Sequence, residues 1–345
     1  MPALPVPLAL PVHPHQLEVQ EFDSYDLIVD LRSPTEYAQA HLPGAVLVAW
    51  TEGEGAPLPR ELGSALADLP RGAAVLVYCE HGGANSARAA ALLEHMGYCA
   101  DVIPGGWTSV RRWVLASIEI LSRVLSVRWL RSAPGGAAKA VLDYLAAEGH
   151  QVLPVAALLG QHRLPGLSLK GDVMPSQAAF ETALVDTLRR LDPSRPVWVD
   201  EVLLPGGDAP TLPASLQAAL RHGRALRIEL ATAQRLAALR TRLDPSVLDA
   251  ARVLESLRHV LPEGARPKAV AWGERLATGT SSHETAAVMV DYMDHLYREL
   301  APPESVRECC LALASLSDEA VRAGLAMLPP PWQNDLNVDP DQINP

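Results

Sequence analysis

Cysteine is scarce in this sequence, and its positions are not those of a metal site. The four cysteines, Cys79, Cys99, Cys309 and Cys310, show neither C-x-x-C pairing nor the spacing of zinc ligands. Four cysteines in 345 residues are also too few for a disulfide scaffold. We therefore expect no bound metal and a reducing, cytoplasmic location.

Long apolar runs are absent as well. No stretch reaches the roughly 20 apolar residues that a membrane-spanning helix needs. The apolar residues 1–10 contain prolines but no basic segment, which argues against a signal peptide. We therefore expect no membrane partner. Phenylalanine is also rare, with 2 residues, so Leu, Val, Ala and Trp must build the core.

Positive charge is in the minority, and the formal net charge is -11 at pH 7. This balance argues against a protein that coats nucleic acid. One segment departs from it. Between Pro104 and Ala140 six basic residues stand against one acidic residue. We expect this basic segment to contact RNA, with Arg111 and Arg112 as the candidate residues.

The order of apolar segments predicts an α/β fold. Short apolar strands at 27–31, 45–48, 74–78 and 100–103 alternate with helical patterns at 34–40, 60–69, 85–96 and 108–120. A second alternating unit continues to residue 230, and the pattern is then helical, including residues 304–323. Strands separated by helices form parallel sheets, which carry active residues at the carboxyl ends of their strands.

These patterns divide the chain into four parts. We expect a first α/β domain at residues 1–120, a second at 121–230 and a helical region at 231–328. The Pro-rich tail at 329–345 is expected to be unordered.

The strongest candidate for chemistry is Cys79, which follows an apolar strand and precedes Gly82 and Gly83. A thiol at the end of a buried strand, facing a helix amino terminus, lies among backbone N–H groups that favour the thiolate. The thiolate is the form that attacks sulfur or selenium. Paired glycines indicate a backbone that closely approaches another segment. We predict that Cys79 carries a persulfide or selenosulfide; the alternative is a buried structural cysteine.

His81 lies in the same loop and is compatible with two roles. It either lowers the thiol pKa or shuttles a proton, or it is an exposed loop residue without a function. Cys99 and the Cys309–Cys310 pair are predicted to pack in the core, the latter within a helix.

Three motifs in order resemble the rhodanese domain. The run from Asp30 to Ala45 matches D-x-R-x-x-x-E-[FY]-x-x-x-H-[IL]-P-G-A at every named position. The Cys79 loop is the second motif, and Gly105-Gly106-Trp107 matches the G-G-[YW] turn before the last rhodanese helix. Asp30 and Arg32 are candidates to orient the loop, although Arg32 is also explained by a structural ion pair.

The remainder of the chain is similar to the bacterial tRNA 2-selenouridine synthase family, in which a rhodanese domain is fused to a P-loop domain. The similar segments are His162–Arg163, Pro175–Glu181, Leu191–Glu201 and Tyr292–Tyr297. The resemblance implies tRNA as partner, with selenium replacing the sulfur of a wobble 2-thiouridine through a geranylated intermediate. It further implies selenophosphate and geranyl pyrophosphate as co-substrates, and no tightly bound cofactor.

The P-loop motif itself is degenerate. A P-loop needs G-x-x-x-x-G-K-[ST], whose hydroxyl holds Mg²⁺. The corresponding residues 133–140 read APGGAAKA, so that alanine replaces both framing glycines and Ala140 replaces the hydroxyl. We therefore expect no hydrolysis of ATP or GTP.

Some features of an anion site remain in this region. Lys139 is retained, and Gly135 and Gly136 precede a helix amino terminus. His162 and Arg163 are compatible with binding phosphate or RNA backbone, or with surface solvation alone. These five residues form the predicted anion site.

Asp200 and Glu201 end an apolar strand where a Walker-B-like carboxylate is expected. Because Ala140 removes the metal hydroxyl, a structural or water-positioning role is favoured over metal binding.

The cysteine loop also departs from the family pattern C-W-R-G-G-x-R-S. His81 and Asn85 stand at the positions of its two arginines, and Arg88, about one helical turn beyond Asn85, is placed to compensate in part. The predicted active-site loop comprises Gly82, Gly83, Asn85, Ser86 and Arg88 around Cys79 and His81.

The working hypothesis is a transferase of the tRNA 2-selenouridine synthase type. One alternative is a rhodanese-type sulfurtransferase with another small-molecule or protein acceptor. Another is a non-catalytic binding protein that keeps the fold and uses the basic segment for a partner.

Overall fold

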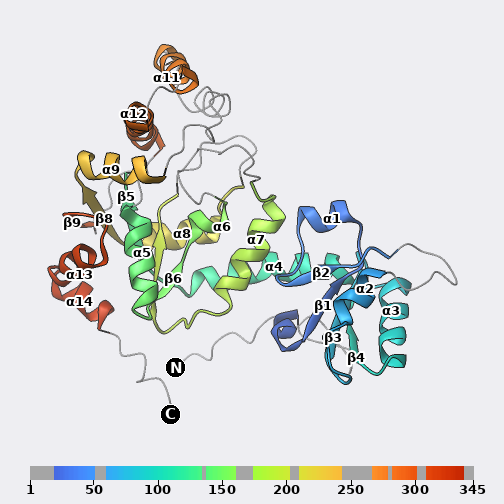
Figure 1. Cartoon of the computed structure of the whole chain (residues 1–345). Coiled ribbons are helices and arrows are strands. Elements are labelled where there is room, and N and C mark those ends of the chain that lie inside the picture. Colours follow the sequence, from blue (N-terminus) through green and yellow to red (C-terminus); the bar gives the residue numbers. More distant parts are fainter. Residues whose placement is uncertain are drawn as a thin grey trace. The chain divides into compact units, whose positions relative to one another are not determined.

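The chain forms two compact units, each built around a parallel sheet (Figure 1). The computed structural model describes residues 19–50, 60–133, 137–160, 174–202, 210–242, 266–278, 282–300 and 308–337. The first unit comprises Met1–Leu121 with Ser176–Arg190, and the second comprises Ser122–Pro175 with Leu191–Pro345. The expected α/β class is confirmed. Among the described helices none is long and apolar enough to cross a membrane.

The first unit has a four-stranded sheet in the order β2-β1-β3-β4, with all neighbours parallel. Its strands are β1 (Leu27–Asp30), β2 (Ala45–Leu47), β3 (Ala74–Tyr78) and β4 (Cys99–Val102). Its helices are η1 (Val19–Ser24), α1 (Pro34–Gln39), α2 (Arg60–Leu66), α3 (Ala84–His95), α4 (Gly106–Arg123) and α7 (Gln177–Leu188). Because parallel strands need crossover connections, this alternation follows directly from the sequence pattern.

The two faces of this sheet bury alternate residues of the central strand. Val75 and Val77 of β3 face a core that includes Leu62 of α2 and Leu93 of α3. Tyr78 packs against Trp107 of α4, with ring centroids 6.1 Å apart. Burial on both faces explains why residues 74–78 form a continuous apolar run.

Helix α7 packs with the first unit, although its residues fall within the range 121–230 assigned to the second domain from the sequence. Its apolar face buries Phe180 and Leu184. Glu181 pairs with Arg111 of α4, and the Arg189 guanidinium lies 4.3 Å from the ring centroid of Phe22. The return of the chain to the first unit cannot be read from the local pattern, because it depends on these long-range contacts.

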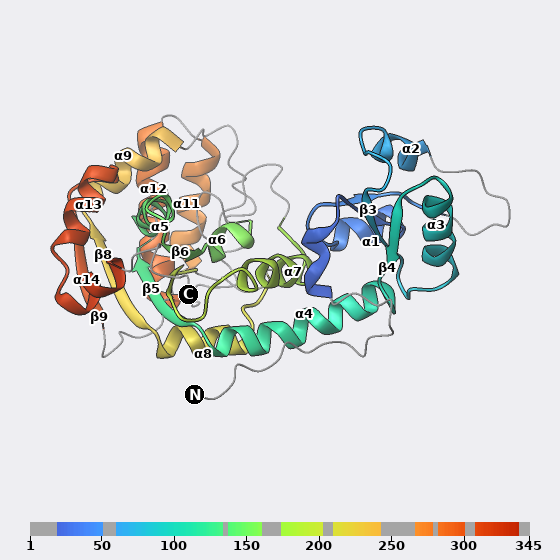
Figure 2. The ribbon, with the colours of Figure 1, turned by 90° about the horizontal axis from the view of Figure 1, so that it is seen from below.

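The second unit has a five-stranded parallel sheet in the order β6-β7-β5-β8-β9. Figure 2 labels four of its strands, β5, β6, β8 and β9. The strands are β5 (Ser126–Ser132), β6 (Gln151–Leu153), β7 (Pro196–Asp200), β8 (Arg224–Leu230) and β9 (Glu308–Leu313). The helices are α5 (Ala137–Ala147), α6 (Val155–Leu158), α8 (Ala214–His222), α9 (Thr232–Arg242), α11 (Arg266–Thr278), α12 (Ser282–Leu300), α13 (Asp318–Ala326) and α14 (Pro330–Leu336).

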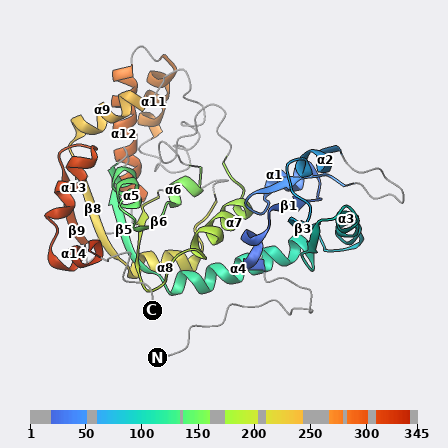
Figure 3. The same cartoon turned by 60° about the horizontal axis from the view of Figure 1, so that its bottom comes forward.

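The core of the second unit lies between the sheet and helices α5, α13 and α14. Leu130, Leu226 and Leu311 of the three strands β5, β8 and β9 meet Val141 of α5 and Val321 of α13. Helix α12 packs beside α9 and α11 elsewhere in the unit (Figure 3). Strand β5 lies at the centre of the sheet, so the segment after it is the place where a ligand is expected in this topology.

The helix expected at 304–323 is wrong. Strand β9 occupies Glu308–Leu313, and α13 begins only after its N-cap residue Ser317. Leu311 and Leu313 are buried while Cys310 and Ala312 are exposed, which is the period-two pattern of a strand. Helix-forming Leu and Ala residues hide this alternation in the sequence, and pairing with β8 overrides their propensity.

Two smaller expectations are also corrected. The tail contains helix α14, because Trp332 is buried against Trp198 with ring centroids 5.8 Å apart. Cys99 and Cys310 are exposed on strands, whereas Cys309 is half-buried and packs against the core of the second unit, on a strand rather than in a helix.

Candidate active site

Cys79 lies immediately after β3, an inner strand of the first sheet, and is half-buried. The loop that follows it leads directly into α3, whose N-cap residue is Gly83. The sequence placed this cysteine at the carboxyl end of a strand and before a helix, and the structure shows both features.

The start of α4 closes the other side of the loop. The backbone N–H of Trp107 donates to the carbonyl oxygen of Cys79 at 2.9 Å, and that of Thr108 donates to Glu80 at 3.0 Å. First-turn N–H groups of a helix have no partner within the helix. The cysteine loop therefore caps α4, and α4 in turn fixes the path of the loop.

Close backbone contact explains two of the glycines at this junction. Gly82 has a φ of +66°, and a Cβ there would lie 2.5 Å from the backbone nitrogen of Gly105. Gly106 has a φ of +55°, and its Cβ would lie 2.1 Å from the carbonyl oxygen of Cys79. The expected close approach is thus present at Gly82 but not at Gly83, whose Cβ would meet no atom within 4 Å.

The surroundings of the Cys79 sulfur favour its thiolate. Burial raises the pKa of the thiol. Hydrogen bonds to Sγ from the Ser86 hydroxyl and from the backbone N–H groups of Gly83, His81 and Ser86 outweigh this cost and hold the pKa below its ordinary value. A lowered pKa at a half-buried thiol is the condition for a nucleophilic cysteine.

The Ser86 hydroxyl has two partners, which suits a thiol that changes its charge. Its Oγ lies 3.4 Å from Cys79 Sγ and 3.0 Å from the carbonyl oxygen of Gly83. A hydroxyl carries one hydrogen, so it donates to the carbonyl while the thiol is protonated. It can turn to the sulfur when the thiolate forms.

A buried ion pair lies under the loop. Arg32 donates to both carboxylate oxygens of Asp30, with Nη2 at 2.6 Å from Oδ2, and Tyr78 donates to the same Oδ2 at 2.7 Å. The Arg32 guanidinium also lies 4.2 Å from the ring centroid of Trp107 and 3.5 Å from the Glu80 carboxylate. Arg32 is therefore both a structural partner of Asp30 and a support for the loop.

The other predicted loop residues lie nearby. The exposed His81 places Nδ1 3.2 Å from Thr108 Oγ1, a contact that the sequence reading did not anticipate. Asn85 is in the first turn of α3 and is half-buried, and Arg88 lies one turn further and is exposed.

The two arginines expected to contact RNA, Arg111 and Arg112, differ in exposure. Arg111 is half-buried, pairs with Glu181 and donates to Thr182 Oγ1 at 3.3 Å. Arg112 is exposed and donates to Ser109 Oγ at 3.3 Å. Arg111 therefore has a structural role where α4 packs on α7. Arg112 is the more accessible candidate for RNA contact.

Most of the other basic residues in this segment form ion pairs. Within the second unit Arg128 pairs with Asp335 at 2.6 Å, and Lys139 pairs with Asp143 at 2.6 Å. Arg131 pairs with both Glu201 and Glu308 at 3.1 Å. Ion pairs therefore compensate much of the excess positive charge counted along the sequence, and all these acidic partners except Asp143, on the same helix as Lys139, come from distant segments.

The degenerate P-loop follows β5, and the structure describes only its flanks. Gly135, Gly136, His162 and Arg163 lie outside the described residues. Lys139 is exposed on α5. Among the described residues no group of His, Cys, Asp or Glu has the arrangement of a metal site.

Asp200 is a buried carboxyl group at the end of β7. Burial raises its pKa to about 6, against backbone hydrogen bonds from Ala156 and Val155 that lower it. Glu201 is buried beside it and pairs with Arg131. Asp200 and Glu201 thus each have partners within the protein, while Glu201 Oε2 is buried without a hydrogen-bond partner among the described residues.

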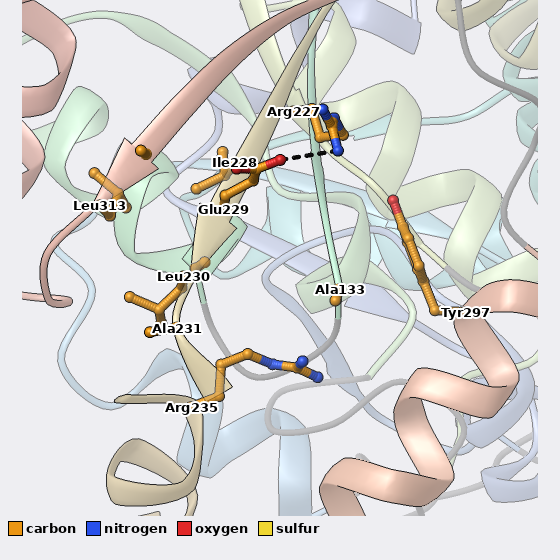
Figure 4. Close-up of a pocket in the computed structure, with 11 residues that line it drawn as sticks. Ala133, Arg227, Ile228, Glu229, Leu230, Ala231, Arg235, Tyr297 and Leu313 are labelled. Carbon is orange, nitrogen blue, oxygen red and sulfur yellow. Dashed lines mark ion pairs between the residues drawn. The ribbon is translucent and has the colours of Figure 1, made fainter. Parts of the chain in front are cut away.

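A cavity of about 530 Å³ opens at the carboxyl ends of β5, β8 and β9. Figure 4 shows Arg235, Tyr297 and Ala133 around it, together with the ion pair of Arg227 and Glu229, whose atoms are 2.9 Å apart. Aliphatic side chains of Ile228, Leu230 and Leu313 line the rest. No local sequence pattern indicates this cavity, because its residues come from segments that are far apart in the chain.

Comparison with known proteins gives matches to both halves of the chain. Residues 15–112 match the family model described as a rhodanese-like domain. The tRNA 2-selenouridine synthase of Chromohalobacter salexigens is 26% identical over 352 residues, which cover 83% of this chain and 93% of that protein.

Two further relatives carry the same name. The tRNA 2-selenouridine synthase of Hahella chejuensis is 28% identical over 61% of this chain and 61% of its own length. That of Nitrosomonas europaea is 26% identical over 50% of this chain and 52% of its own length. Among solved structures, the BH2092 protein of Bacillus halodurans matches 27% of this chain and 59% of its own, with 20% identity and a TM-score of 0.20.

The resemblance seen in the motifs is thereby confirmed: the chain is a relative of the bacterial tRNA 2-selenouridine synthases, with a rhodanese-like domain in its amino-terminal part.

Proposed function

We propose that this protein is a tRNA-modifying transferase that moves selenium or sulfur through Cys79 onto a wobble 2-thiouridine. The observation that carries the proposal is the environment of the Cys79 sulfur. It lies at the end of β3 and accepts hydrogen bonds from the Ser86 hydroxyl and from backbone N–H groups of its own loop. The names of the three relatives supply the substrate, tRNA.

Loading of Cys79 is a displacement on a sulfur atom. With thiosulfate as donor, the thiolate attacks the outer sulfur, the S–S bond of the donor breaks, and sulfite leaves with the electron pair. The product is a persulfide on Cys79. Its outer sulfur carries a negative charge, which the N–H groups of the loop are placed to bind.

The contacts around the loop keep it in place during this step. Arg32 joins Asp30 to Glu80, and the first turn of α4 holds the carbonyl groups of Cys79 and Glu80. A loop whose backbone is fixed from two sides presents its N–H groups without reorganising, which favours charge development on sulfur.

The second unit is proposed to bind an anionic co-substrate. Lys139 and the Gly135–Gly136 segment would hold a pyrophosphate or a single phosphate, as selenophosphate and geranyl pyrophosphate both require. Ala140 has no hydroxyl for Mg²⁺, so this site is proposed to act without nucleotide hydrolysis. No tightly bound cofactor is part of the proposal.

Intact mass spectrometry after incubation with thiosulfate tests the role of Cys79. The wild-type protein should gain one sulfur atom, and Cys79→Ser should gain none. Cys99→Ser is the matched control, because Cys99 is an exposed cysteine at the start of β4. Retention of the added sulfur in Cys79→Ser, or its loss in Cys99→Ser, would disprove the assignment.

A sulfurtransferase with another acceptor is the second candidate, and the charge pairing favours it. Several basic residues expected to meet RNA are engaged with acidic side chains, Arg111 with Glu181 among them. Gel shift with tRNA at low and high salt separates the candidates, because phosphate contacts weaken steeply with salt. Arg112→Glu should weaken binding by the tRNA enzyme. A protein that loads sulfur but shows no salt-dependent tRNA binding is the sulfurtransferase.

A further inference from the structure

A chain of hydrogen bonds links the His81 side chain to the start of α4. His81 Nδ1 lies 3.2 Å from Thr108 Oγ1, and this oxygen lies 3.1 Å from the carbonyl oxygen of Glu80. The same carbonyl accepts the backbone N–H of Thr108 at 3.0 Å. Thr108 is thus fixed at both its backbone and its hydroxyl.

The hydrogen bonds of Thr108 indicate which nitrogen of the His81 ring carries the hydrogen. A carbonyl oxygen only accepts, so the single hydroxyl hydrogen of Thr108 goes to Glu80. The Thr108 oxygen can then only accept from His81, which requires the hydrogen on Nδ1. In the neutral ring the lone pair is therefore on Nε2, the atom at the far side of the ring from Thr108.

The backbone of His81 is tied to the reactive sulfur. Its N–H donates to Cys79 Sγ, while its exposed side chain is held by Thr108. His81 is thus held both at its backbone and at its ring. Neither contact is needed for the capping of α4, which the backbone of Thr108 already satisfies.

We propose that Thr108 is a positioning residue that keeps His81 in the Nδ1–H form, so that Nε2 takes the proton of the acceptor when Cys79 is discharged. The inference rests on the proposed function. The acceptor class is a thiol or thione whose nucleophilic form must lose a hydrogen. Its sulfur attacks the outer sulfur of the persulfide, the S–S bond to Cys79 breaks, and the electron pair returns to Sγ. The displaced hydrogen goes to Nε2 of His81.

The first test reads the tautomer directly. Two-bond ¹H–¹⁵N correlation spectra distinguish Nδ1–H from Nε2–H, and His81→Gln identifies the His81 signals by their absence. The wild-type protein should show the Nδ1–H form. Thr108→Val should release it to the Nε2–H form that free imidazole side chains favour, and Thr108→Ser should retain Nδ1–H. An Nε2–H signal in the wild type, or an Nδ1–H signal that persists in Thr108→Val, overturns the proposal.

The second test separates loading from discharge in single turnovers. Because the hydrogen bond that orients the His81 ring is lost, Thr108→Val should slow discharge to a small thiol roughly 3- to 10-fold. Loading from thiosulfate should stay unchanged in this variant, and Thr108→Ser should restore the discharge rate. Equal slowing of both steps, or no slowing of discharge, contradicts the role of His81.

Failure of the underlying function gives a different result. If the wild-type protein takes no sulfur on Cys79, the transferase proposal falls, whereas the tautomer of His81 remains measurable in the same sample. A correct tautomer without any loading therefore separates the two failures.

Discussion

The Cys79 loop and the segment after β5 each follow an inner strand of a parallel sheet, and the described residues around the two can be compared. After β3, a hydroxyl and three backbone N–H groups surround a sulfur atom. After β5, the described flanks present Ala133 and Ala137, and Lys139 on α5 is paired with Asp143. The topology thus offers a ligand position in both units. Among the described residues, hydrogen-bond donors surround a reactive group only after β3.

The contrast extends to the charges beneath each position. In the first unit the buried pair of Arg32 and Asp30 reaches the loop through Glu80. In the second, Glu201 pairs with Arg131 and Asp200 accepts backbone N–H groups. The first set of contacts supports a reactive group, whereas the second holds two buried carboxyl groups through an ion pair and backbone N–H groups.

The largest effect is expected where the loop meets α4. Gly106→Ala would place a Cβ 2.1 Å from the carbonyl oxygen of Cys79, at a φ of +55°. We expect a loss of about 3 kcal/mol in the free energy of unfolding, together with loss of sulfur loading. Denaturant unfolding measures the former and intact mass the latter.

Gly83→Ala is the matched control for this prediction. A Cβ at Gly83 meets no atom within 4 Å, and its φ is -89°. This variant should stay within about 1 kcal/mol of the wild type. Equal stability losses in the two variants would show that close packing is not what requires glycine at position 106.

A smaller effect is expected from the buried carboxyl group of the second unit. The pKa of Asp200 rises from 3.8 to about 6 on folding, which corresponds to about 3 kcal/mol. Because the folded pKa is raised, this contribution to stability is fully present below pH 3.8 and is lost as the pH rises through about 6. Asparagine does not ionise, so the Asp200→Asn variant does not lose this stability as the pH rises. The stability of the variant relative to wild type should therefore increase between about pH 4 and pH 6.

Unfolding titrations across this pH range check the prediction. Asp143→Asn serves as the control, because this carboxylate is exposed and pairs only at the helix surface with Lys139. It should change stability by less than about 0.5 kcal/mol and show no comparable pH dependence. A flat difference between Asp200→Asn and wild type would contradict the burial argument.

Ser86→Ala sharpens the comparison at the sulfur itself. Removing this hydroxyl leaves the backbone donors but raises the pKa of Cys79, since the Ser86 hydroxyl is one of the groups that lower it. Alkylation by iodoacetamide at neutral pH should slow roughly 5- to 10-fold, in line with the loss of one ordinary hydrogen bond. The difference should vanish at high pH, where the thiolate forms in both proteins.

The alkylation of Cys99 in the same samples is an internal control, because this cysteine is exposed and lies on β4. Its rate should be identical in wild type and Ser86→Ala. An unchanged rate at Cys79 would mean that the backbone N–H groups alone set its reactivity.

Much of the first unit could be predicted because its signals are local. The apolar run 74–78, the cysteine after it and the glycines that follow define a strand, a nucleophile and a tight loop within a few residues. The support by Thr108 could not be predicted in this way, because it reaches His81 across 27 residues of sequence. A threonine in the first turn of a helix carries no local sign of such a contact.

The second unit was harder to read for the same physical reason. Strand β9 consists of residues that also favour helices, and only its pairing with β8 shows its conformation. The basic segment had the correct charges in the sequence, but their acidic partners Glu181, Asp335 and Glu308 lie far along the chain. Net charge over a window therefore overstated the surface available for RNA.

The smallest expected effect concerns nucleotide turnover in the second unit. Catalysis by a P-loop depends on Mg²⁺ between the terminal phosphates, and Ala140 provides only a methyl group where its ligand is needed. Ala138 adds a Cβ where the backbone of a P-loop approaches phosphate. We expect no release of phosphate from ATP or GTP, and no change in this result for Lys139→Ala.

Calorimetry with ATP and Mg²⁺, pyrophosphate and geranyl pyrophosphate tests what remains of the site. Pyrophosphate should bind without dependence on Mg²⁺, because Lys139 and the Gly135–Gly136 amides need no metal to meet it. Lys139→Ala should weaken that binding while leaving stability nearly unchanged, since the pair with Asp143 is exposed on both sides. Nucleotide turnover in the wild type that disappears in Lys139→Ala would show instead that the segment after β5 is an active P-loop. Both units would then carry an activity, and they would differ in the reaction that each supports.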